Sequence, residues 1–183
     1  MGGSVGNAFA FLIETLFSLY IAALMLRTLL EAVGADYYNP VCQVLLRVTE
    51  PLVSPLTRVI PRLGRFNTAA VVLLLVLQTI AVIVVAAISG YADLIDPLQA
   101  LVLAFFRLVR MLLVMYMVLI IAEVILSWVG GGMRHPIIPL IYQLTRPVLE
   151  PIRRVLPTIA GLDLSPLVAI IGIQFLMILI GVR

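Results

Sequence analysis

The amino-acid sequence predicts an all-α membrane protein with four transmembrane helices in two tandem parallel repeats, each with a proline-rich amphipathic segment at the membrane surface. Three observations predict this class. First, 63% of the 183 residues are hydrophobic, 11% are charged and the mean hydropathy is +1.22, so the bilayer must be the main solvent of the chain. Second, several apolar runs are long enough to cross hydrocarbon. Third, a motif of prolines and arginines occurs twice along the chain.

The repeated motif is the stretch around which the chain is organised. Its first copy runs from Thr49 to Ala70 and its second from Thr145 to Pro166, an offset of 96 residues. The residues of the first copy that match an identical residue in the second are Thr49, Pro51, Pro55, Arg58 and Pro61. The sequence therefore predicts a first repeat at residues 1–89 and a second at residues 90–183.

In the first repeat, the spans are expected at residues 8–33 and 68–89, because both stretches are apolar and at least about 20 residues long. Between them, residues 40–62 have apolar positions close to the helical period, which predicts an amphipathic segment on the membrane. Because proline removes an amide donor and clashes with the preceding turn, we expect Pro51, Pro55 and Pro61 to divide this segment into short helical pieces joined by bends.

In the second repeat, the sequence predicts an interfacial lead-in at residues 98–110, a span at 111–129, an interfacial segment at 136–158 and a span at 164–182. Ser165 is the expected N-cap of the last span, and Pro166 suits its first turn, where no amide partner exists. Two spans per repeat place the repeats in the same orientation, so both proline-rich loops face one side.

The distribution of arginine predicts which side that is. The two proline-rich loops carry most of the arginines, so the positive-inside rule places these loops in the cytoplasm and both termini outside. Arg107 and Arg110, at the other end of the third span, count against this topology.

Charged residues within the spans align between the repeats with opposite sign. Arg27 aligns with Glu123, and parallel repeats put aligned positions at equal depth. Because a charge inside the membrane is costly, a partner of opposite sign at the same depth would stabilise both, and we predict an ion pair between Arg27 and Glu123. The alternative is that Arg27 reaches the headgroups alone. In the second motif, Arg154 and Asp163 are close enough to pair if the loop folds back.

Several functions are disfavoured by what the sequence contains. One cysteine, Cys42, and one histidine, His135, are too few for a disulfide, a zinc site or a haem site, so we expect no metal and no cofactor. The sequence has no HExxH motif and no pair of aspartates within a span, which disfavours an enzyme. The net positive charge is carried by the loops rather than by a patch interleaved with aromatic residues, which disfavours a nucleic-acid partner.

These residues give the chain a resemblance to the YggT family of bacterial integral membrane proteins, which has relatives in chloroplasts. In the first repeat the resemblance rests on Arg27, Tyr38-Asn39-Pro40 and the five repeated motif residues. In the second it rests on Ser127-Trp128, Pro147, Pro151, Arg154, Pro157 and the GLDLSP stretch from Gly161 to Pro166. The chain departs from the family at Arg146 and Glu123, where an acidic residue and an arginine are expected respectively.

The resemblance implies a non-enzymatic protein of the bacterial inner membrane, since no member of the family is an established enzyme. Its members are associated with osmotic tolerance, with assembly of cytochrome complexes in chloroplasts, and with division or distribution of membrane-bound material. The function expected is a scaffold or assembly factor that presents cytoplasmic loops to membrane lipids or to a membrane or cytoplasmic protein, with a homo-oligomer as a further state. The alternative is a small oligomeric transporter or channel linked to osmotic stress. The candidate interaction motif consists of Pro51, Pro55, Arg58, Pro61, Pro147, Pro151, Arg153, Arg154, Pro157, Gly161, Asp163, Ser165 and Pro166.

Overall fold

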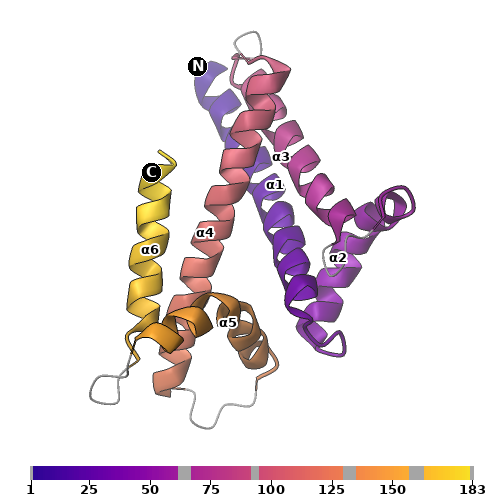
Figure 1. Ribbon diagram of the computed structural model, residues 1–183. Helices are drawn as coiled ribbons and strands as arrows, with labels where there is room; N and C mark the ends of the chain where they lie inside the picture. Colours follow the sequence, from indigo (N-terminus) through magenta and orange to yellow (C-terminus); the bar gives the residue numbers. More distant parts are fainter. Residues whose placement is uncertain (1, 62–66, 92–94, 130–134, 157–162, 182–183) are drawn as a thin grey trace.

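The computed structural model describes residues 2–61, 67–91, 95–129, 135–156 and 163–181. All the regular structure in these residues is helical (Figure 1). In chain order the helices are α1 (Gly2–Val33), α2 (Pro40–Thr57), α3 (Thr68–Ile88), α4 (Pro97–Val129), α5 (Ile137–Val155) and α6 (Ser165–Leu179).

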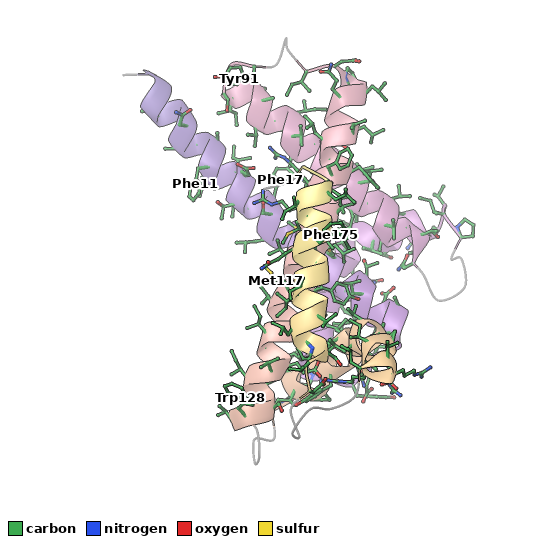
Figure 2. The ribbon with its side chains drawn as sticks, turned by 60° about the vertical axis from the view of Figure 1, so that its left-hand side comes forward. Phe11, Phe17, Tyr91, Met117, Trp128 and Phe175 are labelled. Atoms are coloured by element: carbon green, nitrogen blue, oxygen red, sulfur yellow. The ribbon has the colours of Figure 1, made fainter. Side chains whose placement is uncertain are left out.

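Three of the helices are long and apolar enough to cross a membrane. They are Val5–Val33 of α1, together with α3 and α4 over their whole lengths. The apolar α6 has 15 residues, fewer than the ~20 that a full crossing requires. Large apolar side chains point outward along these helices, as Phe11 of α1 and Phe175 of α6 do (Figure 2), with exposed fractions of 71% and 63%. Such a surface suits lipid, and together with the three long apolar helices it fits a membrane protein.

The helices pack as two groups of three. In the first group, α1 packs against α2 and α3, and its core includes Ile21, Leu24, Val53, Ala70 and Leu73. In the second group, α4 packs against α5 and α6 around Ile120, Leu149, Ala169 and Ile173. Contacts of α3 with α4 and of α1 with α5 join the groups. Each group has an apolar core, and two further clusters lie between the groups, one with Leu30, Cys42 and Leu144 and one with Val82, Ala100 and Ala104. The two short helices α2 and α5, called the surface helices below, lie at the same end of the molecule (Figure 1).

The surface helices run through their prolines, which corrects the expectation of short pieces joined by bends. Pro51 and Pro55 lie inside α2, and Pro147 and Pro151 lie inside α5. All four side chains are exposed. Because the prolines of each helix are four residues apart, they share one face, so the lost hydrogen bonds and ring clashes fall on the outer side while the inner side stays packed. Of the three prolines expected to divide the first segment, Pro61 lies beyond α2.

Two other boundaries differ from those expected. The lead-in at 98–110 and the span at 111–129 form the single helix α4. Ser165 is the first residue of α6 and not its N-cap, which is Leu164 with no side-chain cap. Instead, the Oδ1 atom of Asp163 accepts the Ser165 amide at 2.9 Å, so the acid two residues earlier satisfies the free donor. Pro166 does occupy the first turn, as expected.

Asn39 joins the starts of the two surface helices. Its Oδ1 atom accepts the amide of Val41 at 2.9 Å and so caps α2. Its Nδ2 atom donates to the carbonyl oxygen of Pro136 at 2.6 Å, just before α5. One side chain therefore stabilises a helix start and links the two groups of helices.

Candidate interaction site

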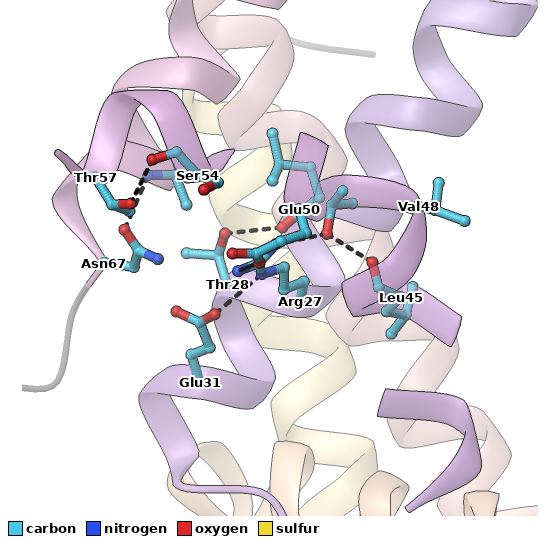
Figure 3. Close-up of polar contacts among 12 residues, drawn as sticks. Arg27, Thr28, Glu31, Leu45, Val48, Glu50, Ser54, Thr57 and Asn67 are labelled. Atoms are coloured by element: carbon cyan, nitrogen blue, oxygen red, sulfur yellow. Dashed lines mark hydrogen bonds and ion pairs between the residues drawn. The ribbon is translucent and has the colours of Figure 1, made fainter. Parts of the chain in front are cut away.

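A buried arginine on α1 holds the first surface helix in place. Arg27 is 4% exposed, and its Nη1 atom donates to Oγ1 of Thr49 at 2.9 Å. Its Nη2 atom donates to Oε2 of Glu50 at 2.6 Å, and its Nε atom donates to Oε1 of Glu31 at 3.0 Å (Figure 3). The Thr49 hydroxyl in turn donates to the carbonyl of Leu45. Each of the three guanidinium nitrogens thus donates a hydrogen bond, and two of these bonds attach α2 to α1.

A buried glutamate on α4 holds the second surface helix. Glu123 is 3% exposed and accepts hydrogen bonds from the Thr145 hydroxyl and, at 2.9 Å, from Nη2 of Arg153. The Nε atom of Arg153 also donates to Oδ2 of Asp163 at 2.8 Å. Since Asp163 accepts the first amide of α6, one chain of contacts connects α4, α5 and the start of α6.

The ion pair predicted between Arg27 and Glu123 is therefore wrong in its partners. Arg27 pairs with Glu31 and Glu50, and Glu123 pairs with Arg153. Each charge bonds the threonine 22 residues on, Arg27 to Thr49 and Glu123 to Thr145. An alignment that predicts equal depth does not make two side chains face each other. Each one faces the surface helix that follows it in the chain.

The pairing predicted for Asp163 is also off by one residue. Its partner is Arg153, whereas Arg154 points away, is 77% exposed and lies 3.6 Å from Glu150. Successive helical residues differ by about 100° in direction, so only one of two adjacent arginines can face α4. The sequence analysis assigned no role to Thr49 and Thr145. The signal that could have identified them is that both copies of the motif carry a threonine at this position.

The outer face of α5 forms a shallow basic groove. It has a volume of about 470 Å³ and is lined by Ala32, Val33, Gln143, Arg146, Pro147, Glu150, Pro151 and Arg154. Within the described part of the chain, Arg146 has no acidic partner. A second hollow, of about 560 Å³, lies beside the Glu123 contacts and is lined in part by Trp128, Tyr142 and Arg153. These two hollows can therefore bind a molecule through the positive charge of their arginines and through the shape of their walls.

The other residues of the candidate motif are distributed around these features. Arg58 lines a groove of α2 together with Pro51 and Pro55, and Pro61 is exposed. Ser165 and Pro166 are buried where α6 begins. Pro157 and Gly161 lie outside the described residues. Across the described ranges, no three side chains of His, Cys, Asp or Glu gather closely enough to hold a metal ion.

The contacts of Asp163 predict a dependence of stability on pH. Burial by itself raises the pKa of the Asp163 carboxyl, but hydrogen bonds from Ser165 and Arg153 and the charge of Arg153 outweigh it and lower the pKa below its ordinary value. The contribution is therefore complete above the unfolded pKa of about 4 and is lost as the pH falls through the lower folded pKa. We expect the melting temperature of the wild type to exceed that of Asp163→Asn at neutral pH and to approach it in acid. A constant difference across this range would contradict the assignment.

Comparison with known proteins identifies relatives over nearly the whole chain. The family model described as CCB3/YggT matches residues 6–88 and again residues 102–182. A protein of Vibrio alginolyticus, described as lying in the proC 3′ region, is 39% identical over 175 residues, covering 96% of this chain and 94% of its own. The protein PA0392 of Pseudomonas aeruginosa is 35% identical over 96% of this chain and 89% of its own. The YggT protein of Escherichia coli K12 is 35% identical over 90% and 85% respectively. No solved structure matches the chain. Its two matches to the family model and these identities show that the chain belongs to the CCB3/YggT family.

Proposed function

We propose that the protein is a non-enzymatic scaffold of the bacterial inner membrane that presents the outer face of α5 to a protein partner in the cytoplasm. In this proposal the chain crosses the bilayer four times, with α6 as its short fourth span, and consists of two parallel repeats. The family model supports the repeats, because its matches start at residues 6 and 102, the same offset as the repeated motif. The arginines of α5 support a cytoplasmic position.

The observation that carries the proposal is that α5 is fixed on one face and basic on the other. Leu144 and Leu149 are 2% and 0% exposed, and Thr145 is bonded to Glu123, so the inner face cannot leave the bundle without losing these contacts. On the outer face, Arg146 and Arg154 lie along the same groove. A rigid helix that carries two exposed guanidinium groups on one face is suited to bind the carboxylates of an acidic segment.

The corresponding face of α2 is less suited to this role. The position that aligns with Arg146 is Glu50, and this half-exposed carboxylate is paired with Arg27 of α1. Thr57 aligns with Arg153, so α2 also lacks that charge. The two surface helices are thus attached in the same way, through Thr49 and Thr145, but differ in the charges that they expose. Partner binding is assigned to α5.

The assignment can be tested by photo-crosslinking in native membranes. A photoreactive residue replacing Gln143 lies in the groove and should attach to one stoichiometric protein partner. We expect Arg146→Ala combined with Arg154→Ala to reduce this product at least about tenfold, since each charged hydrogen bond contributes roughly 1.5–3 kcal/mol. Arg47→Ala, an exposed arginine of α2, is the matched control and should leave the product unchanged.

Flux measurements on the purified protein in liposomes can contradict the scaffold proposal. A scaffold should carry no flux of ions or small solutes. Flux that the wild type supports and Glu123→Gln abolishes would replace the scaffold by a transporter, and a crosslinked product insensitive to both α5 arginines would remove the role of the groove.

A further inference from the structure

A second charged groove lies midway along the long helices, well away from α5. It has a volume of about 370 Å³ and is lined by Glu14 and Ser18 of α1, Gln78 of α3, and Arg107, Arg110, Met111 and Val114 of α4. Glu14 is 13 residues from Arg27, which corresponds to about 20 Å along the helix. The groove is therefore separate from the networks that hold the surface helices.

The position of Gln78 sets the depth of this groove. Helix α3 has 21 residues, none of them charged, and Gln78 is the eleventh. At 1.5 Å per residue it lies about 15 Å from either end of the helix, half the thickness of the hydrocarbon core. With α3 crossing the bilayer, the groove lies close to its centre.

The polar groups of the groove are only partly satisfied within the chain. Nη1 of Arg107 donates to Oε1 of Glu14 at 3.2 Å, but these two side chains are 45% and 46% exposed. No described residue donates to Oε2 of Glu14 or forms an ion pair with the exposed Arg110. The Gln78 side chain is 6% exposed and likewise receives no hydrogen bond from the described residues. Lipid offers no donor or acceptor at this depth, so this groove requires a polar cover.

We propose that a second copy of this chain covers the groove, with Glu14 of each copy pairing with Arg110 of the other. A twofold axis along the membrane normal keeps every residue at its own depth, so the second copy brings its Glu14 to the level of Arg110. The interface is isologous, and both pairs form at once. Glu14 then uses one oxygen for its own Arg107 and the other for the second copy.

Charge complementarity favours this occupant over a small anion. A carboxylate or phosphate would neutralise Arg110 but would also be repelled by Glu14, whose free oxygen it could not satisfy. A lipid tail would satisfy neither group. A second copy supplies both signs of charge at the correct depth and covers the exposed parts of Glu14 and Arg107.

Cysteine crosslinking in liposomes tests the interface with all its charges intact. In a Cys42→Ser background, Ser18→Cys places a thiol in the groove, and Val76→Cys places one at nearly the same depth on the 45% exposed outer side of α3. A short bismaleimide should join two copies through position 18 and not through position 76. Absence of the dimer at position 18, or equal crosslinking at position 76, would overturn the proposal.

Charge removal then tests the pair itself. Glu14→Gln and Arg110→Gln should each weaken self-association about tenfold, and the double variant should be no weaker than the weaker single variant, because all three lack the same pair. Additive losses would overturn the pairing. Acetate or phosphate that protects a monomeric Ser18→Cys protein from maleimide would show an anion site in place of a second copy.

Discussion

Replacing Arg27 by alanine is expected to reduce the free energy of unfolding by about 3–5 kcal/mol, the cost of breaking a buried ion pair by removing one partner. Most of the loss comes from Glu31, because its side chain is 8% exposed and would remain buried without a counter-ion. Glu50 is 53% exposed and contributes little, since water can solvate it. The Thr49 hydroxyl also loses its donor. Denaturation by SDS in mixed micelles, followed by far-UV circular dichroism, measures the change.

The matched control is Arg58→Ala on α2. Its side chain is exposed and forms no ion pair with the described residues, so a change within about 0.5 kcal/mol is expected. Arg27→Lys should lie between the two, because an ammonium group keeps the charge but its single nitrogen cannot reach Glu31, Thr49 and Glu50 as the three nitrogens of the planar guanidinium do. Equal effects of Arg27→Ala and Arg58→Ala would mean that Arg27 simply reaches the headgroups.

Removing the charge of Glu123 should produce the second largest loss, about 1.5–3 kcal/mol, the usual range for a charged hydrogen bond. Glu123→Gln keeps the size of the side chain but leaves Arg153 with Asp163 alone. The Arg153 side chain is 39% exposed, so water offsets part of the loss, and the effect should stay below that of Arg27→Ala. The same SDS titration measures it.

A double-mutant cycle identifies the partner of Glu123. Glu123→Gln and Arg153→Gln should be strongly non-additive, with a coupling energy of about 0.5–3 kcal/mol, whereas Glu123→Gln and Arg27→Gln should be additive. Glu150→Gln provides the exposed comparison, since its contact with Arg154 spans 3.6 Å at the surface. Coupling of Glu123 to Arg27 rather than to Arg153 would contradict the arrangement described here.

The sequence was informative about those properties of a helix that depend only on its own residues, such as its length, its lack of charge and its apolar period. Charge-free stretches such as α3, and the apolar period of α2 and α5, depend only on the residues of the segment itself. Pairing could not be predicted in the same way. The repeat placed Arg27 and Glu123 at equivalent positions, but the direction of each side chain around its helix depends on packing against other helices. For the same reason, the sequence could not show that Arg153, and not Arg154, pairs with Asp163.

The prolines show a different limit of sequence reasoning. A single proline in a helix predicts a break, but the outcome depends on which side the missing hydrogen bond faces. Pro51 and Pro55 are exposed, and so are Pro147 and Pro151. That exposure is a property of the folded molecule, because it requires the opposite face of each helix to be held by Thr49 or Thr145.

These four prolines also determine how each surface helix is rotated about its own axis. A proline has no amide hydrogen, so the carbonyls four residues earlier, at Arg47, Pro51, Gln143 and Pro147, lose their usual intrahelical partner. Together they form a short ridge of backbone oxygen atoms along the outer side of each helix. Hydrocarbon cannot satisfy such atoms, whereas water or a hydrogen-bond donor can. The backbone itself therefore directs this side away from lipid, and replacing every arginine on it would change the charge of the surface without turning the helix over.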